Sequence, residues 1–306
     1  MILQDAIDEF LIYLTSVRTL SENTVIGYRN DLVHLTDFLE KDASVESVTK
    51  EQLMTSIGYL SQKKMASASI NRYIAAVRTL FAYCKKVGHI ERNPALELKT
   101  VKLPKRIPKY LTENEIDQLC SMPTKKELLW ENRDKAVFEM LYSSGCRVSE
   151  LANLKFSDFT DGFHAALVRG KGKKDRYVYF EEDAQKALKN YLDDRRKMFV
   201  DLNMEDTCDY VFVNQRGGHL SVRGISWILS RYSGPEGTNH QISPHALRHT
   251  FATAMLRNGA DVRLVQELLG HSSVSTTQRY THITTEKLIE TYNKAHPHAE
   301  VENEQK

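Results

Sequence analysis

The chain has 306 residues, of which 41% are hydrophobic and 27% charged, and its formal net charge is +2. This length allows one large or two ordinary domains, and no apolar run approaches the roughly 18 residues that a membrane span needs. The first ten residues carry acids where a signal peptide has a basic region, and the four cysteines form no CxxC pair, so we expect a soluble, cytoplasmic protein without disulfides or a metal knuckle.

The first hundred residues are predicted to form a bundle of four short helices. Ser21, Thr49 and either Ser67 or Ser69 are candidate helix starts, and Gly88 lies just beyond the last helix. Apolar residues recur at helical spacing on the inward faces: Ile7, Phe10, Leu11 and Leu14, then Val25, Tyr28, Leu32, Leu35 and Leu39, then Ile70, Ile74, Val77, Leu80, Phe81 and Cys84. We expect a DNA-binding bundle over 1–97, with basic residues on its outer face: Arg72, Arg78, Lys85 and Lys86.

Positive charge is concentrated after the third predicted helix. Residues 1–62 hold four Lys/Arg against ten Asp/Glu, whereas residues 63–109 hold twelve against two. Within this segment, 98–109 has two prolines and five positive charges, which predicts a basic linker. A charge run is often only a solvated helix face. Because this one crosses a linker and precedes the arginine and histidine motifs below, it favours DNA as the partner.

The second domain, 110–306, is predicted to mix helices with a small sheet. Thr112 and Glu115 resemble a capping box that opens its first helix. Strands are expected at 165–169 and 176–180, joined by a basic, glycine-rich hairpin over 170–175. Further helices are expected at 130–142, 183–200, 221–230, 244–257 and 261–269. The predicted fold class is therefore mainly α with a small β-sheet.

Two arginines are candidates for holding a phosphate group. Attack on a phosphodiester places negative charge on non-bridging oxygens, and a guanidinium group meets it with paired N–H donors. Arg147 lies in GCRVSEL and Arg248 in SPHALRH; a surface salt bridge is the ordinary alternative for either one. If Ser243 caps a helix and Pro244 takes its first position, His245 and Arg248 share a face near the helix N-terminus, which attracts phosphate.

Metal chemistry is not expected. His245 and His249 have the i,i+4 spacing of a zinc pair, but no acid lies between them and no third ligand is evident. The remaining candidates are His271, placed at a turn by the helix stop at Gly270, and Tyr280, on a short helix that Ser275 can cap. A phenol with a pKa near 10 needs a base to lose its proton.

The motifs of this chain resemble those of the tyrosine recombinases, most closely the Xer type, over nearly the whole chain. The residues that carry the resemblance are, in chain order, Arg147, His245, Arg248, His271 and Tyr280. The resemblance implies that Tyr280 attacks DNA to form a 3′-phosphotyrosyl bond and free a 5′-hydroxyl, with no cofactor. His245 is then the candidate general base, and His271 a hydrogen-bond donor to a non-bridging oxygen. Lys171 aligns with the general acid, although Lys173, Lys174 or a purely electrostatic hairpin remain alternatives. Glu150 is expected to orient the site rather than react.

The same resemblance implies partners and a role. We expect double-stranded DNA with paired recombinase-binding arms, held by a tetramer of this chain or a homologue through a Holliday junction. A septal DNA translocase, on which some Xer systems depend, is left open. Leu288, Ile289 and Tyr292 form an apolar stripe that is expected to dock onto a neighbouring protomer, with packing on its own domain as the alternative.

The expected role is the resolution of chromosome or plasmid dimers. The alternatives are integration and excision of a mobile element, relaxation by a type IB topoisomerase, and DNA binding without catalysis. Cys146 stands where the family often has a larger aliphatic residue, which predicts sensitivity to thiol reagents.

Overall fold

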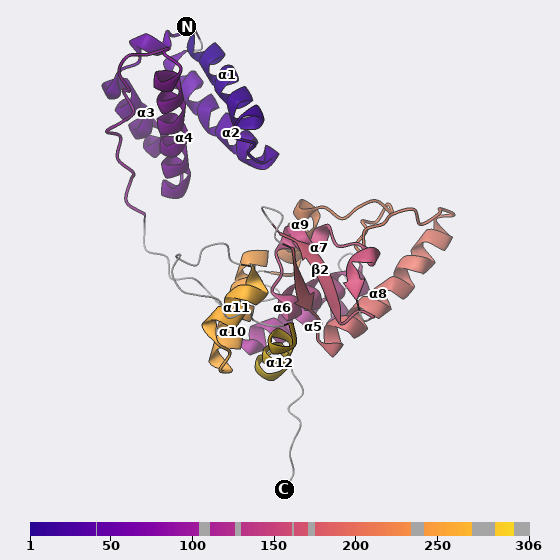
Figure 1. The fold of residues 1–306 in the computed structure, drawn as a ribbon. Helices are drawn as coiled ribbons and strands as arrows, with labels where there is room; N and C mark the ends of the chain where they lie inside the picture. Colours follow the sequence, from indigo (N-terminus) through magenta and orange to yellow (C-terminus); the bar gives the residue numbers. More distant parts are fainter. Residues whose placement is uncertain are drawn as a thin grey trace. The chain divides into compact units, whose positions relative to one another are not determined.

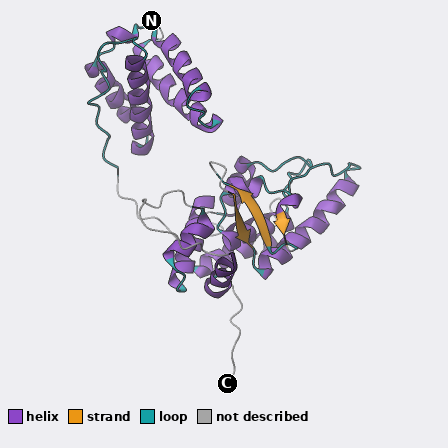
Figure 2. Cartoon of the chain, viewed as in Figure 1, coloured by secondary structure: helices purple, strands orange, loops and turns teal. Residues whose placement is uncertain are grey.

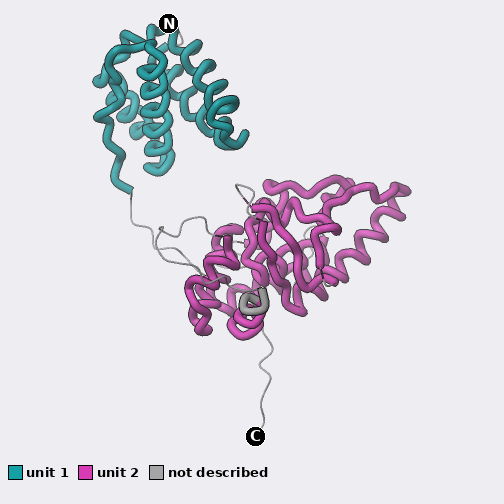
Figure 3. Tube along the Cα trace, viewed as in Figure 1, with its two compact units in different colours: residues 1–107 teal, residues 108–306 magenta. Residues whose placement is uncertain are grey.

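The computed structural model describes residues 1–40, 42–103, 111–125, 130–160, 162–170, 175–233, 242–270 and 285–296. These residues belong to two compact units, 1–107 and 108–306 (Figure 3). Each unit has its own hydrophobic core. The boundary between the units falls inside the basic segment 98–109. In the described residues, no helix has the length and apolar character needed to cross a membrane.

Unit 1 contains the predicted bundle (Figure 1). Its elements are α1 (Leu3–Ser16), α2 (Glu22–Leu39), the 3₁₀ turn η1 (Val45–Ser47), α3 (Lys50–Gln62) and α4 (Ser67–Lys86). The expected helix starts at Ser21 and Thr49 are confirmed, since these residues are the N-caps of α2 and α3. At α3 the cap is reciprocal: the Gln52 N–H donates to Thr49 Oγ1 over 3.2 Å, and the Thr49 N–H donates to Gln52 Oε1 over 2.8 Å.

The segment after α4 packs back onto unit 1 further than the sequence suggested. Leu98 is buried in the core. The Asn71 side chain accepts from the Val101 N–H over 2.8 Å and donates to its carbonyl over 3.0 Å. Arg78, expected on the outer face of the bundle, donates to the Leu98 carbonyl. The first residues of the predicted linker are thus held against α4.

Unit 2 is built around a central helix, α6 (Glu131–Ser144), whose residues are buried almost throughout. This helix contacts α5 (Glu113–Lys125), α8 (Glu182–Asp201), α9 (Val222–Tyr232) and α10 (Pro244–Arg257). The remaining helical elements are α7 (Val148–Ala152), η2 (Phe156–Asp158), α11 (Val262–Leu269) and α12 (Thr285–Ala295). The capping box predicted at the start of α5 is present, with the Thr112 N–H donating to Glu115 Oε2 over 2.8 Å.

A small antiparallel sheet completes unit 2 (Figure 2). Its strands are β1 (Phe159–Thr160), β2 (Ala165–Arg169) and β3 (Asp175–Tyr179), in that order. The two predicted strands are confirmed, although β3 begins one residue earlier than expected, and β1 was not predicted. The pairing of Val168 with Arg176 fixes the register of β3.

Helix α12 packs on its own unit in the single chain. Tyr292 is 1% exposed, and its hydroxyl lies 2.9 Å and 3.2 Å from the backbone carbonyl oxygens of Ser143 and Tyr179. Ile289 packs against the same cluster, whereas the side chain of Leu288 is outside the described residues. The apolar stripe thus has partners in cis here, and its exchange between protomers stays a prediction.

Candidate active site

A tight turn after α6 places the first candidate arginine. Gly145 ends the helix in the left-handed conformation, with φ of 57°. A Cβ atom at this position would lie 2.3 Å from Cδ1 of Phe251 in α10, so only glycine fits the turn. The chain can therefore turn directly from α6 into Arg147, the N-cap residue of α7.

Glu150 holds Arg147 from one turn further along α7. Its Oε1 accepts from Arg147 Nη1 and its Oε2 from the Arg147 backbone N–H, each over 2.7 Å. The carboxylate is almost fully buried. Burial alone would raise the pKa of Glu150, but the hydrogen bonds and charge of Arg176, followed by those of Arg147, hold it below its ordinary value. Glu150 is therefore ionised at neutral pH and anchors two guanidinium groups.

The second candidate arginine comes from α10, which begins as predicted. Ser243 is the N-cap, with its side chain accepting from the Ala246 N–H over 3.2 Å, and Pro244 takes the first helical position. One turn later, Arg248 is buried and donates from Nη1 to the Gly145 carbonyl over 2.7 Å. Burial, and then the charges of Arg147 and Arg176, lower the pKa of Arg248 to about 10. It is thus still charged at neutral pH, although two other arginines lie near it.

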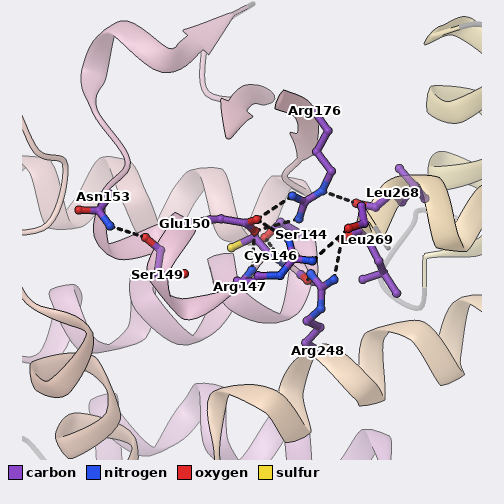
Figure 4. Close-up of polar contacts among 12 residues, drawn as sticks. Ser144, Cys146, Arg147, Ser149, Glu150, Asn153, Arg176, Arg248, Leu268 and Leu269 are labelled. Atoms are coloured by element: carbon purple, nitrogen blue, oxygen red, sulfur yellow. Dashed lines mark hydrogen bonds and ion pairs between the residues drawn. The ribbon is translucent and has the colours of Figure 1, made fainter. Parts of the chain in front are cut away.

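The C-terminal end of α11 gathers three guanidinium groups (Figure 4). The last carbonyls of a helix lack partners within the helix and form its negative end. Here three consecutive ones are each taken by a different arginine: Leu268 accepts from Arg176 Nε over 2.8 Å, Leu269 from Arg248 Nη2 over 2.5 Å, and Gly270 from Arg147 Nη2 over 3.0 Å. We call this set of three carbonyls and three arginines the arginine cluster. The chain continues from it directly into His271.

Arg176 is the member of this cluster that the sequence motifs did not predict. Its Nη1 and Nη2 donate to the two oxygens of Glu150 over 2.8 and 2.9 Å, and its side chain is 11% exposed. One signal was available: Arg176 precedes the apolar Val178 by two positions in the same predicted strand, so strand alternation places both on one face. A buried arginine needs a carboxylate partner, and that partner is 26 residues away.

The other predicted site residues are placed only in part. His245 lies exposed at the second position of α10, one turn before Arg248 on the same helix face. Lys171, with its alternatives Lys173 and Lys174, lies outside the described residues, as do His271, Ser275 and Tyr280. The structure therefore brings together Arg147, Arg248 and Glu150, and it adds Arg176.

The expected sensitivity of Cys146 to thiol reagents is wrong for the folded protein. The side chain is 1% exposed, and burial raises the pKa of its thiol to about 11. The reactive species is the thiolate, which is about 10⁻³ of such a thiol at pH 8. Cys146 is a packing residue beneath the arginine cluster.

The arrangement suits binding of a tetrahedral oxyanion. Each guanidinium group has five N–H donors. In Arg147 and Arg248 the side-chain hydrogen bonds described above use only part of these donors, so others remain for a ligand. Arg147 is the more accessible, with a side chain 36% exposed. Among the described residues no cluster of His, Cys, Asp or Glu is spaced to hold a metal ion.

Both units of this chain are similar to known proteins. Residues 109–287 match the Phage integrase family, and residues 7–88 match the "Phage integrase, N-terminal SAM-like domain". A protein named "Tyrosine recombinase XerC" from Treponema denticola is 39% identical over 305 residues, covering 97% of this chain and 100% of that protein. One of the same name from Oceanobacillus iheyensis is 40% identical over 295 residues, covering 96% of each.

Solved structures share the fold. A lambda integrase fragment, crystallised as a dimer bound to a core site, has a TM-score of 0.70 at 20% identity and covers 93% of this chain and 100% of that chain. The XerH recombinase bound to its palindromic difH substrate has a TM-score of 0.66 at 22% identity, with coverage of 84% and 75%. At these identities the likeness concerns the fold alone.

Proposed function

The chain belongs to the phage integrase family, and from this premise we propose that it is a Xer-type site-specific tyrosine recombinase. The observation that carries the proposal is the arginine cluster: Arg147 and Arg248 converge on the end of α11, immediately before the segment that carries His271 and Tyr280. The relatives named as recombinases match across both units, which favours recombination over a catalytically silent DNA-binding role.

In the proposed reaction, the Tyr280 oxygen attacks the scissile phosphorus. A P–O bond to tyrosine forms as the P–O5′ bond breaks, giving a 3′-phosphotyrosyl enzyme and a free 5′-hydroxyl. His245 takes the phenolic proton, and Lys171 protonates the leaving oxygen. Arg147, Arg248 and His271 stabilise the charge that develops on the non-bridging oxygens. The covalent bond conserves the energy for rejoining, so no cofactor is needed.

The proposed substrate is double-stranded DNA with two recombinase-binding arms, acted on in the cytoplasm by a tetramer of this chain or a homologue. We propose resolution of chromosome or plasmid dimers as the role. Genome-wide capture of covalent protein–DNA adducts tests both activity and role, with the Tyr280→Phe protein as the blank. Adducts at one chromosomal or plasmid site agree with dimer resolution, adducts at the ends of a mobile element indicate integration and excision, and the absence of adducts refutes the proposal.

Lys171 is proposed to act as the general acid, and a modified substrate tests this. Lys171→Ala should cleave ordinary DNA poorly but recover most activity on a 5′-bridging phosphorothiolate, because a sulfur leaving group departs without a proton. The measurement is single-turnover cleavage of both substrates. Lys173→Ala and Lys174→Ala are the matched controls from the same segment. Rescue of either of these instead of Lys171→Ala would transfer the role to that lysine.

The tail is proposed to exchange between protomers on DNA, although α12 packs in cis in the single chain. A chain lacking residues 285–306 should fill a two-arm site less cooperatively and recombine far less, while single-arm binding, which rests on phosphate contacts, changes little. Gel shifts on one-arm and two-arm DNA, together with a recombination assay, measure this. Loss of helicity and of single-arm binding would mean that Tyr292 serves only its own unit, and wild-type recombination would mean that the tail is dispensable.

A further inference from the structure

We propose that Arg176 is a positioning residue for the strand-cleavage reaction. It couples β3 to the end of α11 and to the phosphate clamp, the name used here for Arg147 and Arg248. The inference rests on the proposed function, since it concerns the same site. Its basis is a single side chain that contacts both Glu150 of α7, which holds Arg147, and the end of α11, whose carbonyls accept from Arg147 and Arg248.

The first contact is with Glu150. Arg176 offers Nη1 and Nη2 to the two carboxylate oxygens, in the side-by-side geometry that makes arginine–carboxylate pairs strong and directional. The same two oxygens hold the Nη1 and the backbone N–H of Arg147. The orientation of Arg147 is therefore set by a carboxylate that Arg176 also holds.

The second contact is with the end of α11. Nε of Arg176 donates to the Leu268 carbonyl over 2.8 Å. The arginine also lies directly against Gly270, where an added Cβ would be 3.0 Å from Arg176 Cδ and 3.3 Å from Nε. Gly270 has a φ of 62°, so this close packing and the turn into residue 271 occur together. Arg176 thereby supports the backbone from which His271 continues.

The position of Arg176 on β3 connects these contacts with the candidate general acid Lys171. Arg176 is the second residue of β3 and lies five residues after Lys171 in the chain. Such a side chain ties the start of the strand that follows Lys171 in sequence to the carboxylate that holds Arg147 and to the end of α11. Positioning residues that orient reacting groups in this way typically change activity by about 10- to 100-fold when altered.

The test compares Arg176→Lys with Arg195→Lys. Arg195 is a matched control because it too is buried, forms a bidentate pair with Asp206 and donates to backbone carbonyls, those of Cys208, Tyr210 and Val211. None of these partners belongs to the arginine cluster. Lysine keeps the charge in both variants but cannot make the paired and carbonyl contacts at the same time.

Arg176→Lys should lower the single-turnover cleavage rate of a suicide DNA substrate by about 10- to 100-fold, with the DNA dissociation constant changed by less than about twofold because phosphate contacts elsewhere are kept. Arg195→Lys should shift the melting temperature without lowering the cleavage rate of the folded fraction. Rates are measured below the melting transition of each variant.

A second readout is independent of cleavage. Sulfate should raise the melting temperature of the wild type and of Arg195→Lys by the same amount, since both keep the oriented clamp, but should raise that of Arg176→Lys less. If sulfate raised the melting temperature of Arg176→Lys as much as that of the wild type, and cleavage were unimpaired, the role of Arg176 would be overturned. It would also be overturned if Arg176→Lys could not fold while Arg195→Lys could. A wild-type chain that forms no adduct on DNA would instead refute the proposed function, and the sulfate comparison would still decide whether Arg176 orients the clamp.

Discussion

Tyr280→Phe is expected to abolish covalent attachment to DNA and to leave DNA binding unchanged within about twofold. The substitution removes only the nucleophilic oxygen, and loss of the nucleophile lowers kcat by about 10⁶-fold in a serine protease. Binding should survive because phosphate contacts, rather than one hydroxyl group, dominate affinity for DNA. A suicide substrate that traps the 3′-phosphotyrosyl intermediate, analysed by denaturing electrophoresis, gives the adduct yield.

Tyr177→Phe is a suitable control, since Tyr177 is exposed on β3 and loses only a hydroxyl group. It should form the adduct at the wild-type rate. An adduct at wild-type yield in Tyr280→Phe would exclude Tyr280 as the nucleophile.

The second large effect is expected from the clamp. Arg147→Lys and Arg248→Lys keep a positive charge but lose the paired donors, so each should lower cleavage by about 10²-fold or more, as removal of one oxyanion donor does elsewhere. At position 248 the reason is geometric: one guanidinium group bridges the carbonyls of Gly145 and Leu269, which lie in different segments, and a single ammonium group cannot replace it. The measurement is single-turnover cleavage at saturating DNA.

The pH dependence of Arg248→Lys gives a further check. The surroundings that lower the pKa of Arg248 to about 10, burial and the charges of Arg147 and Arg176, also lower the pKa of a lysine there. The charged form of such a lysine is present below its shifted pKa and lost above it. The rate of the variant relative to wild type should therefore rise as the pH falls. Arg196→Lys, at an exposed position on α8, should match wild type throughout, and near-normal cleavage by either clamp variant would mean that the arginine concerned is structural.

Local signals in the sequence predicted the helices well. The side chains of Thr49, Thr112 and Ser243 accept from N–H groups in the first turn of their own helices, so the information lies within three residues of each boundary. Ser21 is also an N-cap, and its hydroxyl lies 2.8 Å from that of Thr24. The pair Arg147 and Arg248 was also predictable, because the surrounding motifs are distinctive. In both cases the decisive residues are close together in the chain or carry a recognisable pattern.

Most of what the sequence did not reveal depends on contacts between distant segments. Strand β1 is the exception: its partners Ala165 and Ala166 are only five and seven residues away, but two residues are too few for strand alternation to show. The packing of Leu98 and Val101 on α4 depends on Arg78 and Asn71. The acceptor of Arg176 Nε is 92 residues away, at Leu268. No window along the chain contains both members of such a pair, so neither periodicity nor spacing could predict them.

At the end of α11, the hydrogen-bond acceptors for the arginines are backbone carbonyls, which amino-acid substitution does not remove. Leu268 and Leu269 are buried through their side chains, in a cluster with Phe251 and Tyr292, while their backbone carbonyls hold Arg176 and Arg248. A mutational scan replaces side chains and leaves every carbonyl in place, so it would score both positions as ordinary core leucines. Replacing the amide link after Leu269 with an ester weakens its carbonyl as an acceptor and leaves the leucine intact, while it also removes the Gly270 N–H that donates to the Glu267 carbonyl. Semisynthesis could thus separate the packing of the leucine side chain from the hydrogen bond of its carbonyl, which no codon change can separate.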